Sequence, residues 1–257
     1  MNTGSLDLLI ILPAFLAGIL VLITHVPLGE QVLKRGIVFI DLAIAQIAAL
    51  GVIIAGMADF DPQGWKLQLA AGGAAMLGAL LLTWTEKRWP EVQEAQIGVL
   101  FILAATGGLL LLAHNPHGSE HLRDLLAGQI LWVRYEQLLM PALGTAIIVA
   151  VLVIFRQRLS RLGFYLLFAL AVTASVQLVG VYLVFASLIV PSLAVRNYGS
   201  KRLAFAYLVG IGGYASGLIL STLHDLPSGA LIVWCLAVLA VVVHACGPAA
   251  RPSQSVG

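Results

Sequence analysis

The chain has 257 residues, of which 60% are hydrophobic and 10% are charged, and its mean hydropathy is +1.00. These values lie far outside the range of soluble globular proteins and therefore predict a membrane protein with several spanning segments. The net charge of +2 is too small to indicate a nucleic acid or an acidic ligand as a partner.

Eight apolar runs have lengths that suit membrane helices. They are Leu6–Thr24, Ile37–Met57, Leu67–Thr85, Ile97–Ala113, Leu138–Phe155, Phe164–Val195, Leu203–Leu223 and Leu226–Ala245. The first run has no basic segment before it and no small-residue cleavage site after it, which favours a retained span over a signal peptide. We predict an all-α, polytopic membrane bundle with eight or nine crossings, consisting of one domain over residues 1–246 and a disordered tail over residues 247–257.

Lysine and arginine are concentrated in alternate loops. They follow the first, third, fifth and sixth runs, as Lys34, Arg35, Lys87, Arg88, Arg156, Arg158, Arg161, Arg196, Lys201 and Arg202. Because loops rich in lysine and arginine stay in the cytoplasm, these loops are predicted to be cytoplasmic and the N-terminus to lie outside. The segment 114–137 also carries arginines, although counting the spans places it outside.

Asp41 is the one acid well inside an apolar run. Because a charge within the bilayer costs a few kcal/mol, this carboxylate needs protein or water around it. Either it pairs with Lys34 or Arg35 near the membrane surface, or it lies near a transport pathway. Gln46, five residues later, lies about 140° around the helix from Asp41. We predict it as an interhelical hydrogen-bond donor and include it among the pathway candidates.

A cluster of imidazoles and a carboxylate lies between the fourth and fifth runs. It comprises His114, His117, Glu120 and His121. These ligand types suit zinc, manganese or iron, but their spacing matches no closed structural site, so a metal contact and simple solvation both remain open. The following segment, Asp124–Leu131, is predicted to form an interfacial or re-entrant helix.

The run Phe164–Val195 is too long for one ordinary crossing. Its 32 residues would extend roughly 48 Å as a helix, whereas the hydrocarbon core is about 30 Å thick. We therefore predict a crossing to about Val179, a turn near Gly180, and a shorter helix that ends near Pro191. Broken helices of this kind lie beside transport pathways, so Gly180, Pro191 and Ser192 are candidate gate residues.

Sequence motifs for enzymatic chemistry are lacking. The chain has no nucleotide-binding GxxxxGK segment, no nucleophile elbow and no HExxH pair, and Cys235 and Cys246 are not spaced as metal ligands. The sequence thus predicts a protein that is not an enzyme, and any ATP would have to be hydrolysed by another subunit.

Four stretches, taken in order, resemble the permease subunit of bacterial metal-ion ABC transporters. They are Leu33–Gly51 with Asp41, Glu94–Phe101, Asp124–Leu131, and Val179–Arg196 with Gly180, Leu183, Pro191 and Arg196. The resemblance implies a fold like that of the vitamin B12 and siderophore permeases, in the bacterial inner membrane. It also implies a second permease subunit, a cytoplasmic ATPase and an external metal-binding protein as partners. The transported ion would be zinc, manganese or iron, and no cofactor would be bound by this chain.

The sequence departs from the family pattern at two places. The family has a histidine four residues after the acid of its second span, where this chain has Ala45. The cytoplasmic link that carries the family's ATPase-coupling helix is shortened here to Arg156–Gly163. The candidate coupling residues in and next to it are Arg156, Arg158, Leu159, Arg161 and Leu162.

Two other functions compete with a metal-importing permease. A gradient-driven secondary transporter would carry several ionisable groups deep in its spans, whereas Asp41 is nearly alone here. A non-transporting membrane scaffold derived from such a permease is supported by the short cytoplasmic link.

Overall fold

A computed structural model describes residues 8–57, 65–112, 130–155 and 160–248, and these residues form nine α-helices. The helices are α1 (Leu8–Arg35), α2 (Ile40–Gly56), α3 (Trp65–Arg88), α4 (Gln93–Leu112), α6 (Tyr135–Ile154), α7 (Arg161–Val179), α8 (Val181–Ala194), α9 (Arg202–His224) and α10 (Ser228–Ala245). Three short 3-10 helices accompany them: η1 (Pro90–Val92), η2 (Ile130–Trp132) and η3 (Gly199–Lys201). Seven of the helices are long and apolar enough to cross a membrane, and α2 and α8 are shorter apolar helices. The predicted all-α multi-pass bundle is therefore confirmed.

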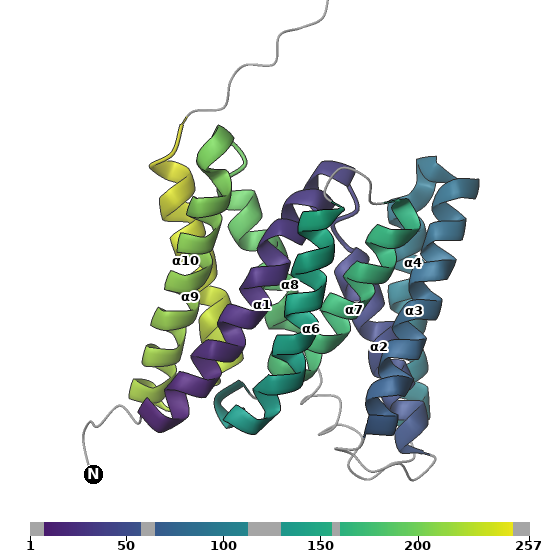
Figure 1. The fold of residues 1–257 in the computed structure, drawn as a ribbon, viewed down its shortest axis with the longest axis horizontal. Helices are drawn as coiled ribbons and strands as arrows, with labels where there is room; N and C mark the ends of the chain where they lie inside the picture. Colours follow the sequence, from purple (N-terminus) through teal and green to yellow (C-terminus); the bar gives the residue numbers. More distant parts are fainter. Residues whose placement is uncertain (1–7, 58–64, 113–129, 156–159, 249–257) are drawn as a thin grey trace, which may run out of the picture.

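The helices form three groups side by side. In Figure 1, α2, α3 and α4 stand on one side, α9 and α10 stand on the other, and α1, α6, α7 and α8 lie between them. This arrangement places the centre of the bundle where the oblique α1 crosses the broken pair α7 and α8.

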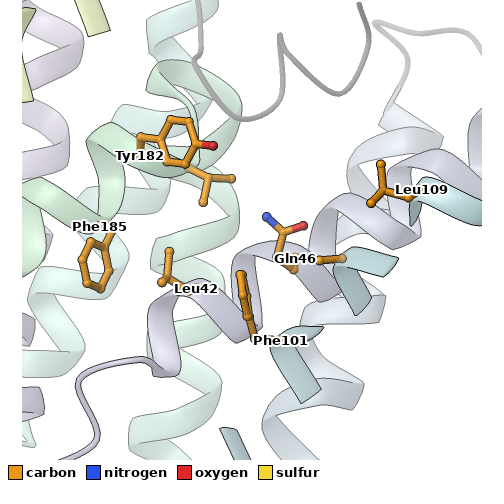
Figure 2. Close-up of a pocket in the computed structure, with 8 residues that line it drawn as sticks. Leu42, Gln46, Phe101, Leu109, Tyr182 and Phe185 are labelled. Atoms are coloured by element: carbon orange, nitrogen blue, oxygen red, sulfur yellow. The ribbon is translucent and has the colours of Figure 1, made fainter. Parts of the chain in front are cut away.

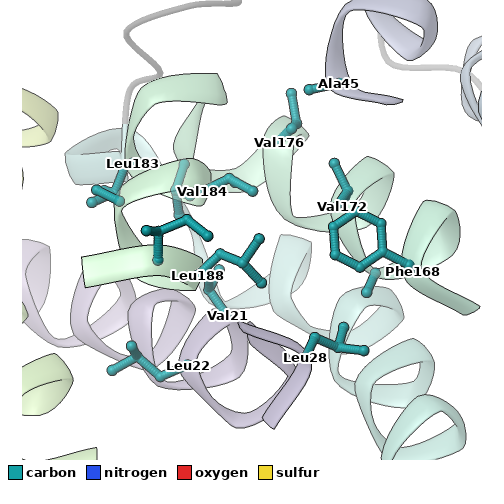
Figure 3. Packing of buried hydrophobic residues seen from close by; sticks show 14 of the residues in the cluster. Val21, Leu22, Leu28, Ala45, Phe168, Val172, Val176, Leu183, Val184 and Leu188 are labelled. Atoms are coloured by element: carbon teal, nitrogen blue, oxygen red, sulfur yellow. The ribbon is translucent and has the colours of Figure 1, made fainter. Parts of the chain in front are cut away.

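A buried apolar core lies between α1, α7 and α8. Val21 and Leu28 of α1 belong to one buried cluster with Phe168 and Val172 of α7 and Leu188 of α8 (Figure 3). Because lipid tails are as apolar as these side chains, such packing gains its energy from close contact and not from the removal of water. This core holds α8 in place although the helix is short.

The first helix is longer than its apolar run indicates. The sequence predicts a span that ends at Thr24, but α1 continues to Arg35 and contains both Pro13 and Pro27. The extension is possible because Thr24 and His25 are covered by neighbouring helices and need no contact with lipid or water. The end of the run therefore marks a change in polarity, not the end of the helix.

Charged side chains link several helices at one end of the bundle. Glu30 of α1 forms ion pairs with Lys34, at 2.6 Å, and with Arg202 at the start of α9. Arg161 at the start of α7 lies 3.7 Å from Glu86 of α3. The C-terminal ends of α1 and α3 and the N-terminal ends of α7 and α9 therefore share the upper edge in Figure 1. This grouping agrees with the alternation of basic loops along the sequence.

The close approach of α1 and α8 depends on Gly29. A β-carbon at this position would overlap the backbone carbonyl oxygen of Leu188 and lie 2.7 Å from Ser192 Oγ. Overpacking of this kind costs about 1–3 kcal/mol. We therefore expect Gly29→Ala to lower the midpoint of thermal unfolding of the purified protein in detergent. Gly72→Ala is the matched control, because its β-carbon meets nothing within 4 Å, and it is expected to leave that midpoint unchanged or slightly raised. Equal midpoints for the two variants would contradict this account of the α1–α8 contact.

Candidate functional site around the helix break

The long run is interrupted where the sequence predicts a turn. Gly180 separates α7 from α8 and has φ 81° and ψ 163°, a backbone conformation that is essentially confined to glycine. Its N–H donates to the carbonyl of Val176 at 2.8 Å, and its carbonyl accepts from the N–H of Val184 at 3.1 Å. The break therefore keeps its own polar backbone groups bonded, as a buried break in a membrane protein must.

The second half of the broken pair ends later than predicted. Pro191 lies inside α8, which continues to Ala194, so the prediction that this helix ends near Pro191 is wrong. Proline removes one backbone hydrogen bond and crowds the carbonyl of the preceding turn, but α8 nevertheless continues for one more short turn, within a buried environment. Ser192 is buried and donates from Oγ to the carbonyl of Val26 at 3.3 Å, which ties α8 to α1.

A pocket of about 310 Å³ lies beside the N-terminal part of α8. Its walls come from three helices: Leu42 and Gln46 of α2, Phe101, Ala105 and Leu109 of α4, and Val181, Tyr182 and Phe185 of α8. Figure 2 draws these side chains and labels six of them, with the carboxamide of Gln46 directed from α2 toward the side of the pocket that Tyr182 occupies. The pocket is mostly apolar, and its side-chain polar groups are the Gln46 amide and the Tyr182 hydroxyl.

Gln46 is the buried polar side chain of this pocket. It is 6% exposed, and its amide makes no hydrogen bond to any residue that the structure describes. The predicted interhelical hydrogen bond is therefore not formed within the described part of the chain. Gln46 instead faces a pocket that residues of α2, α4 and α8 line.

Asp41 lies on a different side of α2 and is 1% exposed. Neither carboxylate oxygen has a hydrogen-bond partner among the described residues. Of the two alternatives for Asp41, the pairing with Lys34 or Arg35 is not formed: Lys34 bonds to Glu30, and Arg35 lies 4.2 Å from the ring centre of Phe164. Asp41 is in the first turn of α2, where the positive end of the helix dipole partly compensates a negative charge.

Ala45 follows Asp41 by one helical turn and belongs to the apolar core, beside Val176 of α7 (Figure 3). The position at which the resemblance implies a histidine is thus occupied by a side chain that ligates no metal. Within the residues that the structure describes, no three His, Cys, Asp or Glu side chains come close enough to hold a metal ion together.

Several predicted site residues lie outside the described residues. They are His114, His117, Glu120 and His121 of the histidine cluster, and Arg156, Arg158 and Leu159 of the shortened link. The segment Asp124–Leu131 is described only from Ile130, which begins η2. The tail 247–257 is described only at its first two residues.

Two of the predicted coupling residues are described. Arg161 and Leu162 form the first turn of α7, and both are exposed. The side chain of Arg161 is 60% exposed even while it pairs with Glu86. The next turn is anchored inside the bundle, because the hydroxyl of the buried Tyr165 accepts a 3.3 Å hydrogen bond from Gln93. The exposed turn is therefore directly continuous with the packed interior.

His25 is a polar residue that the sequence analysis does not identify. It is fully buried in α1, its Nδ1 lies 2.9 Å from Thr24 Oγ1 and 3.0 Å from the carbonyl of Val21, and its Nε2 has no partner among the described residues. The available signal was its position directly after the apolar run. An apolar run that ends at Thr24 places His25 in the following loop, whereas α1 continues through His25 to Arg35.

Comparison with known proteins agrees with this architecture. The model of a family described as ABC 3 transport matches residues 7–165 and 158–247. The high-affinity zinc uptake system membrane protein ZnuB of Haemophilus influenzae is 23% identical over 255 residues, which cover 91% of this chain and 96% of ZnuB. The manganese transport system membrane protein MntC of Halalkalibacterium halodurans is 26% identical over 243 residues, which cover 86% of this chain and 81% of MntC.

A solved structure has the same fold. A chain of PsaBC from Streptococcus pneumoniae, determined in complex with Fab, superposes with a TM-score of 0.75 at 19% sequence identity, over 92% of this chain and 91% of that one. The family match reaches from the first spanning helix to the last, and the helices around Gly180 and the pocket lie within it. On these grounds the chain belongs to the ABC 3 transport family and is a multi-pass membrane component of the permease type.

Proposed function

We propose that the chain is the membrane-spanning permease subunit of an ATP-driven importer for a divalent transition metal, namely zinc, manganese or iron. Its relatives named for zinc and manganese transport support the cargo class, and the family supports the ABC type of transporter. The energy would come from a separate cytoplasmic ATPase. A binding protein outside the bacterial inner membrane would deliver the ion, and a second permease subunit would complete the path, with the N-terminus of each permease outside.

This proposal depends mainly on the helix break at Gly180, which lies beside a pocket. Both features lie in the part of the chain that the family model matches. A break divides one long apolar run into two helices that can tilt separately, which alternating access requires. The pocket lies at the junction of α2, α4 and α8, so a tilt of α8 changes its walls. Asp41, Gln46, Gly180, Pro191 and Ser192 are the proposed pathway and gate residues.

We further propose that the ATPase couples to the start of α7. Arg161 and Leu162 are exposed there, next to Arg156, Arg158 and Leu159, and Tyr165 connects this turn to the interior. Because α7 leads directly to Gly180, a displacement of its first turn reaches the break through one continuous helix.

Uptake by defined vesicles tests the proposed function. Vesicles that contain the permease together with its ATPase, internal ATP and the external binding protein are expected to accumulate zinc, manganese or iron, and vesicles with the permease alone are not. Accumulation by the permease alone, driven by a proton or sodium gradient, would instead establish a secondary transporter. A permease that neither transports these ions nor stimulates an ATPase in any combination would be a scaffold.

A further inference from the structure

The first helix lacks one of its own backbone hydrogen bonds where it crosses the bundle. Pro27 lies inside α1 and has no N–H group, so the carbonyl of Ile23, four residues earlier, receives no bond from its own helix. The hydroxyl of Tyr207 in α9 donates to this carbonyl, with 3.3 Å between the two oxygens. A side chain from a neighbouring helix therefore supplies the hydrogen bond that the proline removes, as a break inside a membrane requires.

A second proline lies close to this region, in α8. Pro191 also removes one hydrogen bond from its own helix. The parts of the two helices next to their prolines are in contact, because the hydroxyl of Ser192 donates to the carbonyl of Val26 at 3.3 Å. Gly29 lies so close to α8 that a β-carbon on it would overlap the backbone there. The two helices are thus joined beside the turns in which each of them lacks a backbone hydrogen bond.

The part of α1 that follows Pro27 also reaches the first turn of α7. The guanidinium of Arg35 lies 4.2 Å from the ring centre of Phe164, a fully buried side chain of that turn. Glu30, in the same part of α1, forms an ion pair with Arg202 at the start of α9. This last part of α1 therefore contacts α7 at its far end and α8 close to the proline.

We propose that residues 28–35 of α1 act as a lever, hinged at Pro27, which carries the movement of the ATPase from the first turn of α7 to the end of α8. Tyr207 is the positioning residue of this hinge, because it bonds the carbonyl of Ile23 that the proline leaves free. Helices bend at prolines, so the lever turns where the helical bond is missing. The inference rests on the proposed importer function and adds a second route to α8, beside the continuous one through α7.

A double-mutant cycle tests the role of Tyr207 at the hinge. Tyr207→Phe leaves the carbonyl of Ile23 without a donor and is expected to lower the midpoint of thermal unfolding by roughly 2–6 °C. In the Pro27→Ala background, residue 27 supplies its own N–H, so Tyr207→Phe is expected to change this midpoint by less than about 1 °C. Tyr135→Phe is the control, because Tyr135 is exposed and its hydroxyl bonds to none of the described residues. Equal losses in both backgrounds overturn the assignment of Tyr207.

The ratio of metal uptake to ATP hydrolysis distinguishes a lever from a merely structural contact. It is measured in vesicles that contain the permease, its ATPase and the external binding protein, with radiolabelled zinc, manganese and iron in separate samples. Loss of folded protein lowers uptake and hydrolysis together and leaves their ratio unchanged.

Two variants are expected to lower this ratio about threefold to tenfold. Pro27→Ala restores the helical bond and stiffens the hinge, and Arg35→Gln removes the cation that contacts Phe164. Pro13→Ala makes the same change as Pro27→Ala nearer the start of α1 and is expected to keep the normal ratio. A normal ratio in either of the two variants overturns the lever and leaves the importer function standing. If the unmodified transporter neither accumulates any of the three ions nor stimulates the ATPase, the importer function itself is wrong.

Discussion

Gly180→Ala is expected to reduce metal uptake by the assembled transporter about tenfold. At φ 81° and ψ 163°, any residue with a β-carbon is strained by about 1–3 kcal/mol. The strain is relieved only if α7 and α8 shift relative to each other, and such a shift changes the pocket walls at Val181 and Tyr182. Uptake of radiolabelled zinc, normalised to the amount of permease in the membrane, measures the effect.

The matched control for this variant is Gly144→Ala in α6. Gly144 lies inside a regular helix, and a β-carbon there meets nothing within 4 Å, so this variant is expected to transport normally. The midpoint of thermal unfolding of both purified variants shows whether a lower uptake is caused by an unstable fold or by the changed geometry between α7 and α8. Normal uptake by Gly180→Ala would show that the break needs no glycine and that its geometry does not govern transport.

The second large effect is expected at Asp41. The carboxylate is buried without a hydrogen-bond partner in the described part of the chain, and an acid in such a position costs roughly 3 kcal/mol on membrane-insertion scales. Asp41→Leu is therefore expected to raise the midpoint of thermal unfolding in detergent by roughly 6–12 °C, because 1 kcal/mol shifts this midpoint by about 2–4 °C in a chain of this size. The same variant is expected to lose most metal uptake, because a destabilising acid beside the pocket-lining Leu42 is explained by a role in transport.

Thr173→Val provides the comparison for Asp41→Leu. Thr173 of α7 is also buried, and its hydroxyl also lacks a partner among the described residues, but it is uncharged. Its replacement by the similarly shaped valine is expected to raise stability slightly and to leave uptake unchanged. If Asp41→Leu likewise retains full uptake, Asp41 has no part in the pathway and its burial is only a structural cost.

Much of the fold can be predicted from local properties of the sequence. The lengths of the apolar runs indicate the spanning helices, because the thickness of the hydrocarbon core sets the number of residues a crossing needs. The break at Gly180 is predictable for the same reason, since one run exceeds that length and contains a residue suited to the turn. The ends of α1 and α8 are not predictable in this way, because His25 and Pro191 lie within helices that neighbouring helices cover.

The surroundings of the candidate site residues could not be predicted from the sequence, because they depend on contacts between segments far apart in the chain. The sequence places Asp41 near two cations, but the fold pairs Lys34 with Glu30 and brings Arg35 against Phe164, so neither cation is left for the acid. The spacing of Asp41 and Gln46 predicts that they lie on different sides of α2, although it does not identify what each side meets. Only the packing of α2 beside α4 and α8 shows that Gln46 faces a pocket.

The sequence by itself thus determined a helical membrane bundle with a broken helix at Gly180, because run length, charge distribution and glycine conformation act locally. That the bundle is a permease was implied by the resemblance of four stretches to a family, not by these local properties. The tertiary structure decided that Gln46 lines a pocket and that Asp41 is buried without a partner within the described residues. The physical reason is that the direction of a side chain follows from its own helix, whereas its partners depend on how that helix packs against others.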